Sequence, residues 1–301
     1  MSVSLDAIGA RLAAGGRLTD GEAEELATSH DLVSLGMLAD EARARRHGRR
    51  TTFVRVFDVG IDAAGSISPD AVPTATGEIR LVGQPASVGD AVSAVRRVAA
   101  AAGGRPLSGF ALDEVKTVAR HSRISLEAIA RHLRGAGLEC IAEVPIDRLD
   151  DPAADVQAVV SGGLGAPRVT VTRMHEASRL SVLRRVSQLQ RATGAIRVFA
   201  PLAREVNPAE PSTGYDDVKQ VALARLLVDN IESIQVDWAL YGPKLAQVAL
   251  TFGADDVDSV SPADTLDLGV RRAPLEEILR NIRAASLEPV QRDGRFRAVA
   301  S

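Results

Sequence analysis

The chain has 301 residues, of which 46% are apolar and 25% charged, and its formal net charge is −3. A chain of this size can bury a sizeable core, either as one large α/β barrel or as two ordinary domains. The weakly acidic charge offers no basic field for nucleic acid or an anionic membrane, and an aromatic content of 3% argues against stacking platforms for single-stranded nucleic acid.

The cysteine content and the start of the chain bear on where the protein resides. Cys140 is the only cysteine, so no internal disulfide can form, which indicates an intracellular protein. The first residues lack the basic and apolar regions of a signal peptide, and no apolar run reaches the roughly 18 residues of a membrane span. We therefore expect a cytoplasmic protein that binds neither membrane nor nucleic acid.

Residues 1–50 are predicted to form a helical extension. Thr19 and Glu22 have the spacing of a capping box, and Leu32, Leu35 and Leu38 recur at helical intervals. The basic run at residues 43–50 is interpreted as a solvated helix end, with contact to an anionic ligand as the alternative.

From residue 51 onward, strand-like runs alternate with helical patterns. The expected strands are Thr51–Phe57, Glu78–Gly83, Pro106–Ala111, Leu138–Val144, Arg168–Met174, Ala195–Leu202, Ser233–Leu240 and Ala254–Val260. The expected helices are Val88–Ala102, Leu126–Gly135, Ala177–Ala192, Tyr215–Asn230, Pro243–Phe252 and Pro274–Ala285. Eight such units predict a closed (β/α)8 barrel over residues 51–301, with a polar tail after the last helix.

One unit lacks its helix. The segment Asp58–Gly77 is rich in Gly, Ala, Ser and Pro and has no helical face. The barrel wall over the first two strands is therefore expected to be covered by the N-terminal helices or by another protein.

A specific resemblance covers nearly the whole chain and is strongest in its second half. It lies in Thr213–Asn230, Trp238, Gly242-Pro-Lys244 and Gly253-Ala-Asp-Asp256, with weaker matches at His47-Gly48, Leu81-Val-Gly83, Phe110, Glu114 and Phe199–Leu202. These stretches are similar to aminofutalosine synthase, dehypoxanthine futalosine cyclase and the deazaflavin-cofactor synthases. The resemblance implies a TIM-type barrel of the radical-SAM kind and a place in menaquinone biosynthesis by the futalosine pathway.

The chain departs from this family where the chemistry resides. The family binds an iron–sulfur cluster through three cysteines in a C-x3-C-x2-C loop after the first strand, whereas this loop offers only Asp58, Asp62 and Asp70. Iron–sulfur clusters need thiolate ligands, which carboxylates do not replace. Gln84 also replaces a family glycine beside the SAM methionine. We therefore expect no cofactor and no [4Fe–4S] cluster, and SAM binding is doubtful.

Barrel geometry places ligands at the carboxyl ends of the strands. Glu114 and His175 match family positions and are candidates for general acid–base work, or else inherited residues with structural hydrogen bonds. The candidate ligand-binding residues are Gln84, Glu143, Arg173, Arg204, Asp237 and Asp255. The two arginines could clamp a carboxylate or phosphate or be solvated, and Asp255 could instead hold loops.

Other features favour structural interpretations. The run Ser161–Gly165 is interpreted as a helix end or turn, because no strand precedes it and no Gly-Lys-Ser/Thr follows. None of the five histidines forms a pair with zinc-ligand spacing, so no metal site is expected. Cys140 is interpreted as a small core residue.

Three functions stay open. The chain could be a non-catalytic partner or metabolite-binding protein of the futalosine pathway, with a nucleoside, a pathway enzyme or a second copy of itself as partner. It could be a non-radical lyase or hydrolase that acts on a futalosine-like nucleoside. It could also be a radical-SAM enzyme that takes its cluster ligands from another subunit.

Overall fold

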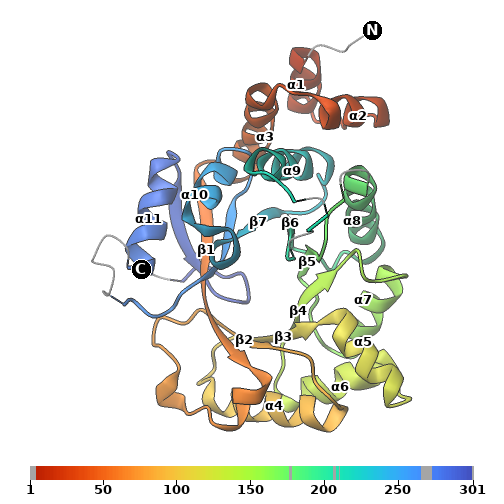
Figure 1. Ribbon diagram of the computed structural model, residues 1–301, viewed down its shortest axis with the longest axis vertical. Helices are drawn as coiled ribbons and strands as arrows, with labels where there is room; N and C mark the ends of the chain where they lie inside the picture. Colours follow the sequence, from red (N-terminus) through yellow and green to blue (C-terminus); the bar gives the residue numbers. More distant parts are fainter. Residues whose placement is uncertain (1–4, 176–177, 206–207, 210, 266–272, 300–301) are drawn as a thin grey trace.

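The computed structural model describes residues 5–175, 178–205, 208–209, 211–265 and 273–299. Its centre is a closed ring of eight parallel strands in which β1 pairs with both β8 and β2 (Figure 1). The strands are β1 (Arg50–Gly60), β2 (Glu78–Val82), β3 (Leu107–Ala111), β4 (Cys140–Pro145), β5 (Arg168–Val171), β6 (Val198–Ala203), β7 (Ser233–Asp237) and β8 (Asp256–Val260). The predicted barrel is therefore confirmed.

Helices surround the ring of strands (Figure 1). They are α4 (Val88–Ala101), α5 (Leu112–His121), α6 (Leu126–Ala136), α7 (Pro152–Ser161), α8 (Arg179–Thr193), α9 (Gly214–Leu227), α10 (Trp238–Leu250) and α11 (Pro274–Ala284). The patterns did not reveal α5 and α7, and the expected start of α8 at Ala177 lies outside the described residues. Ser161 ends α7 and Gly162 caps it, as expected for a helix end.

Local sequence signals fix where several helices begin. Ser87, Ser125 and Asp151 each accept a hydrogen bond from the backbone N–H three residues later, which caps α4, α6 and α7. The inward faces of these helices bury apolar side chains against the sheet, among them Val95, Leu133 and Val159.

The polar tail contains a ninth strand, which sequence reasoning missed. In β9 (Glu288–Arg292), residues 288–292 run parallel to residues 50–54 of β1, below the stretch from Val56 to Gly60 that pairs with β2. The two short strands thus follow one another along the same edge of the long strand β1. Tertiary pairing, and not an apolar run, makes this segment a strand.

The segment between β1 and β2 forms no α-helix but two short 3-10 turns, η1 (Ile61–Gly65) and η2 (Pro69–Ala71). Ala64 and Val72 anchor these turns in the core. The N-terminal helices α1 (Leu5–Ala13), α2 (Asp20–Thr28) and α3 (Leu32–His47) do not cover this wall. They pack at α9, on a different side of the barrel, so the expected covering role of these helices is wrong (Figure 1).

The N-terminal helices carry the predicted capping box at Thr19 and Glu22. The solvated helix end expected at residues 43–50 is only partly correct. Arg43 is 3% exposed and donates to the carbonyl of Gly48 at 2.9 Å, while Arg46 donates to the carbonyl of Ile231 at 2.7 Å. Cationic side chains satisfy the free carbonyls that follow a helix, and this explains why these arginines turn inward.

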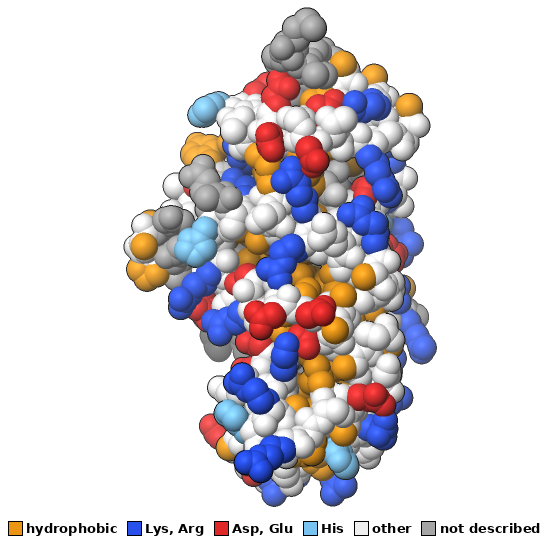
Figure 2. All heavy atoms as spheres, turned by 90° about the vertical axis from the view of Figure 1, so that its right-hand side faces the viewer, with side chains coloured by type: hydrophobic (Ala, Val, Ile, Leu, Met, Phe, Trp, Pro, Cys, Tyr) orange, Lys and Arg blue, Asp and Glu red, His pale blue; other side chains and the backbone are white. Residues whose placement is uncertain are grey.

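Figure 2 shows the face that carries α5 to α8, where Lys and Arg side chains are spread out with acidic ones between them. This face therefore presents no continuous basic stripe of the kind that tracks nucleic acid. Among the described residues, no helix is long and apolar enough to cross a membrane.

Candidate functional site

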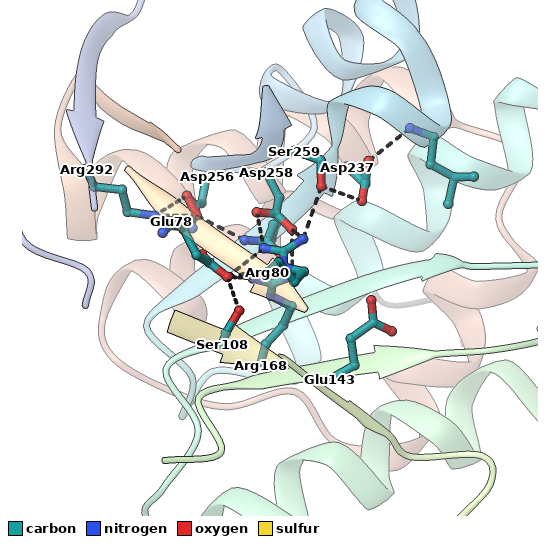
Figure 3. A network of polar contacts seen from close by, with 12 residues as sticks. Glu78, Arg80, Ser108, Glu143, Arg168, Asp237, Asp256, Asp258, Ser259 and Arg292 are labelled. Atoms are coloured by element: carbon teal, nitrogen blue, oxygen red, sulfur yellow. Dashed lines mark hydrogen bonds and ion pairs between the residues drawn. The ribbon is translucent and has the colours of Figure 1, made fainter. Parts of the chain in front are cut away.

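The interior of the barrel is charged. Glu78 and Arg80 on β2, Arg168 on β5 and Asp258 on β8 point toward one another across the ring (Figure 3). All four are at most 4% exposed. We call these four residues the buried quartet. Its two positive and two negative charges balance.

Arg80 is the hub of the buried quartet. Its Nη1 and Nη2 donate to the two carboxylate oxygens of Asp258 at 3.1 and 3.0 Å, and its Nε donates to Glu78 at 3.1 Å. Arg168 donates to Asp258 at 2.7 Å, and Ser108 on β3 donates to Glu78. Such two-pronged arginine–carboxylate pairs are the strong and directional ones.

Electrostatics keep the quartet ionised. Burial alone would raise the pKa of Asp258, but the charges of Arg168 and Arg80 outweigh it and hold that pKa far below its ordinary value. The pKa of Glu78 is lowered in the same way, against burial, by Arg80 and Arg168. The buried quartet is therefore fully ionised at the centre of the barrel.

A second cluster lies at the carboxyl ends of β4, β6 and β7. Arg204 forms an ion pair with Asp237 and lies 3.1 Å from Glu143. Ser259 on β8 donates to Asp237 at 3.1 Å, which links this cluster to the buried quartet (Figure 3). We call Glu143, Arg204 and Asp237 the mouth triad.

Arg204 is not fully satisfied. Its Nε and Nη2 are buried, and neither has a hydrogen-bond acceptor among the described residues; Nη2 lies 3.1 Å from Glu143 without forming a hydrogen bond to it. Burial lowers the pKa of Arg204, but Glu143 and Asp237 raise it above its ordinary value, so the guanidinium stays charged. A ligand oxygen that reached these two N–H groups would complete their hydrogen bonds.

Asp58 adds a further carboxylate at the mouth. It is the register partner of Arg80, so its side chain lies on the same face of the sheet. Partial burial raises its pKa, Arg80 opposes this shift, and Asp258 and Glu78 reinforce it. The mouth therefore carries an excess of negative charge.

Of the two expected acid–base residues, neither lies in the mouth triad. Glu114 is in the first turn of α5, where its carboxylate accepts the backbone N–H of Ala111 at 3.0 Å. Burial raises its pKa, and this hydrogen bond lowers it in part. His175 lies exposed in the loop between β5 and α8, and its carbonyl accepts from Ser178. The geometry gives Glu114 a helix-capping contact.

Two further expected residues lie on the rim. Gln84 is exposed after β2. Arg173 forms an ion pair with Glu205 at 2.7 Å, and its side chain is 57% exposed. Glu205 also lies 3.1 Å from Arg148. Exposed pairs of this kind contribute little to stability.

Asp255 lies at the opposite end of the barrel from the mouth, so its expected placement there is wrong. It precedes β8, where it forms an ion pair with the buried Arg225 and accepts the backbone N–H of Ile234 at 2.9 Å. His47 lies 3.3 Å from its carboxylate. This part of the motif at residues 253–256, with His47, thus joins α3, α9 and β8.

The stretch Gly242-Pro-Lys244, which also carries the family resemblance, has a structural role as well. Gly242 has a φ of 75°, which breaks α10 into two parts, and Pro243 starts the second part. The hydroxyl of Tyr241 donates to the carbonyl of Ala203 at the end of β6.

Sequence reasoning missed the buried quartet, although a signal was present. Glu78 and Arg80 in β2 and Gln235 and Asp237 in β7 alternate with apolar residues, and Asp256 and Asp258 in β8 flank the apolar Val257. In a closed parallel barrel covered by helices, that period of two places the polar set inside.

The residues do not fit the iron–sulfur cluster that the resemblance implies. The loop after β1 contains no cysteine, and Ala64 and Val72 fill its inner side. Cys140 lies in β4, where burial raises the pKa of its thiol to about 12, so it is not a ready thiolate ligand. Among the described residues, no group of three or more His, Cys, Asp or Glu could hold a metal ion.

Solved structures place this fold among known barrels. Methylornithine synthase (PylB) superposes with a TM-score of 0.68 over 95% of this chain and 97% of that one, at 16% identity. The hydrogenase maturase HydG superposes with a TM-score of 0.67 over 95% of this chain and 75% of that one, at 11% identity. The protein is thus a (β/α)8 barrel of the radical-SAM kind, as predicted.

Sequence comparison shows which proteins the chain resembles. Residues 201–299 match the CofH/MqnC C-terminal region. Over 64% of its length, the chain is 31% identical to 5-amino-6-(D-ribitylamino)uracil–L-tyrosine 4-hydroxyphenyl transferase of Methanothermobacter thermautotrophicus, covering 61% of that relative. Aminodeoxyfutalosine synthase of Thermus thermophilus is 29% identical over 62% of this chain and 58% of its own length. Cyclic dehypoxanthine futalosine synthase of Streptomyces coelicolor is 27% identical over 60% and 51%.

The resemblance to these enzymes that the sequence showed is confirmed. The matches span about half to three fifths of the length of the three relatives.

Proposed function

We propose that this chain is a metabolite-binding member of the family whose barrel mouth holds the neutral, hydroxyl-rich ribosyl part of a futalosine-type nucleoside, without radical chemistry. The observation that carries the proposal is Arg204, a buried cation between two carboxylates with two N–H groups that lack acceptors. The names of the relatives supply the ligand class, because they refer to futalosine and to a ribitylamino-uracil.

Charge at the mouth triad favours a neutral, hydroxyl-bearing part of a ligand over an anionic group. Arg204 contributes one positive charge, whereas Glu143 and Asp237 contribute two negative ones. An anionic group would gain from Arg204 but would face both carboxylates and Asp58. Hydroxyl groups can accept from the guanidinium and donate to the carboxylates, so they suit both kinds of partner.

The experiment is a titration of the purified protein with futalosine, aminodeoxyfutalosine and inosine, read by thermal shift and calorimetry. We expect a nucleoside to stabilise the protein by about 2.7 kcal/mol at 100 times its Kd. 3-Enolpyruvylbenzoate, which has carboxylates but no ribose hydroxyls, is the comparison and should bind more weakly.

Arg204→Lys tests the site, because it keeps the charge between the carboxylates but lacks the planar fork of N–H groups. It should weaken nucleoside binding roughly tenfold or more, since a hydrogen bond to a charged group contributes about 1.5–3 kcal/mol. Arg173→Lys on the exposed rim is the matched control. If no nucleoside binds, or if both variants bind as the natural protein does, the proposal is wrong.

A further inference from the structure

A second cavity lies beside the mouth. It has a volume of about 130 Å³ and lies between the end of β6 and the first turns of α8, α9 and α10. Arg204 lines it as well as belonging to the mouth triad, so the two sites are neighbours. We call this space the side cavity.

The side cavity contains an unsatisfied amide. Gln220 on α9 lines it and is only 3% exposed, yet neither its Oε1 nor its Nε2 has a hydrogen-bond partner among the described residues. Leaving a buried amide unpaired is costly, so such a group in a folded protein calls for an explanation. The Nε of Arg179, another lining residue, is also buried and lacks a partner.

Two other polar groups of the side cavity are already engaged. Tyr241 donates to the carbonyl of Ala203, and Asp216 accepts from the backbone and the hydroxyl of Thr213. Neither group therefore provides a partner for Gln220. Both atoms of the Gln220 amide are therefore available for hydrogen bonds to a ligand.

The chemistry of an amide defines that partner. Its Oε1 needs a donor and its Nε2 needs an acceptor, side by side and in one plane. The N–H and C=O of a lactam provide this pair. The volume suits a six-membered ring, because an apolar cavity of about 150 Å³ holds benzene.

We propose that the side cavity binds the lactam edge of a heterocyclic base, with Gln220 as the residue that recognises it through two hydrogen bonds. This inference deepens the proposed function, since it assigns the base of the same nucleoside to the side cavity and its hydroxyl groups to the mouth triad. Gln220 then acts as a specificity-determining residue.

Hypoxanthine and 1-methylhypoxanthine are the probes, measured by calorimetry on the full chain. The methyl group removes the lactam N–H, so the natural protein should bind hypoxanthine at least tenfold more tightly. Gln220→Met keeps the size of the side chain and removes both hydrogen-bonding atoms. It should abolish the preference for hypoxanthine over its methylated form. Gln157→Met, on the exposed side of α7, is the control and should leave the preference intact.

Folding provides an independent readout. Because no described residue pairs with the amide of Gln220, Gln220→Met should raise the melting temperature of the free protein while it weakens base binding. A variant that merely misfolded would lose both.

The outcomes separate this inference from the proposed function. If futalosine binds through Arg204 but Gln220→Met changes neither affinity nor preference, the proposed function stands and the inference fails. If hypoxanthine binds through Gln220 while Arg204→Lys has no effect on the nucleoside, the inference stands and the mouth assignment fails. Failure of hypoxanthine to bind the natural protein overturns the inference.

Discussion

Individual side chains decide the electrostatics of the barrel interior. Asp258 accepts from both Arg80 and Arg168 and is fully buried, so together with Glu78 it neutralises two buried cations. A well-packed apolar core could match the stability of such an arrangement, but removing one member leaves an unpaired buried charge. The quartet is therefore sensitive to any single change.

Asp258→Asn should lower the free energy of unfolding by about 3–5 kcal/mol at pH 7, because it leaves Arg80 and Arg168 with Glu78 alone. Chemical denaturation measures this difference. Asp150→Asn, at an exposed position before α7, is the control and should change stability by less than about 0.5 kcal/mol. Equal effects of the two variants would show that the quartet is not held as described.

The pH dependence follows from the direction of these pKa shifts. The pKa of Asp258 is lowered in the folded protein against burial by Arg168 and Arg80, so its stabilisation is fully present above its unfolded pKa of about 3.9. It is lost as pH falls below that value toward the folded pKa. The difference in unfolding free energy between the natural protein and Asp258→Asn should thus be constant from about pH 8 to 5 and shrink below about pH 4. A difference that grew on acidification would contradict this sign.

The opposite sign applies to Asp217 on α9. Burial raises its pKa, which a hydrogen bond from Ser212 offsets in part, so its ionised form costs stability at neutral pH. That cost disappears as pH falls through the raised pKa. On acidification, the stability lost from the buried quartet is therefore partly offset, because protonation of Asp217 removes the cost of its buried charge.

At the scale of elements, β9 and the residues after it cover the end of the barrel opposite the mouth. Arg292 donates to Asp256 at 2.6 Å, and Arg295 pairs with Glu139 at 2.6 Å. Phe296 stacks under Arg292, with 4.3 Å from the guanidinium carbon to the ring centre. The last described residues thus contact β1, the start of β8 and the residue before β4, and hold these three strands together.

A chain that ends at Leu287 should be insoluble or unfolded at 25 °C, because it exposes the free edge of β1 and leaves Asp256 without its arginine. Circular dichroism and size-exclusion chromatography measure this. A chain that ends at Val299 keeps the contacts described above and is the control. Arg292→Met is the milder variant and should cost about 3–5 kcal/mol. A folded, soluble chain ending at Leu287 would refute this role for β9.

At the scale of the whole molecule, the fold matches known barrels, but the residues do not provide the ligands of an iron–sulfur cluster. The barrel superposes on methylornithine synthase over 95% of the chain, but its loop after β1 offers no thiolate, and its one thiol lies half-buried in β4.

After anaerobic reconstitution with iron and sulfide, we expect no stoichiometric [4Fe–4S] cluster on the chain, because such clusters need several thiolates. Iron analysis and visible absorbance measure this. Cys140→Ser is the control and should give the same background as the natural protein. Stoichiometric iron that disappears in Cys140→Ser would revive the radical-SAM hypothesis with ligands from another subunit.

The candidate site was only partly predictable. Glu143, Arg204 and Asp237 were expected at the mouth from their places at the ends of strands, and the structure brings the three together. Asp255 was misplaced, because position along a strand decides which end of the barrel a residue faces. Gln220 gave no sequence signal, since a glutamine on a helix becomes unusual only when its surroundings leave it unpaired.

The sequence by itself determined the barrel, because each βα unit is specified by local periodicity and by the caps at its helix ends. It also determined the absence of a cysteine loop after β1, since this depends on residue identity alone. Only the tertiary structure decided the pairing of β9, the inward turn of Arg43 and Arg46, the buried quartet and the side cavity. The reason is physical: these features depend on contacts between residues distant in the chain, which no local period encodes.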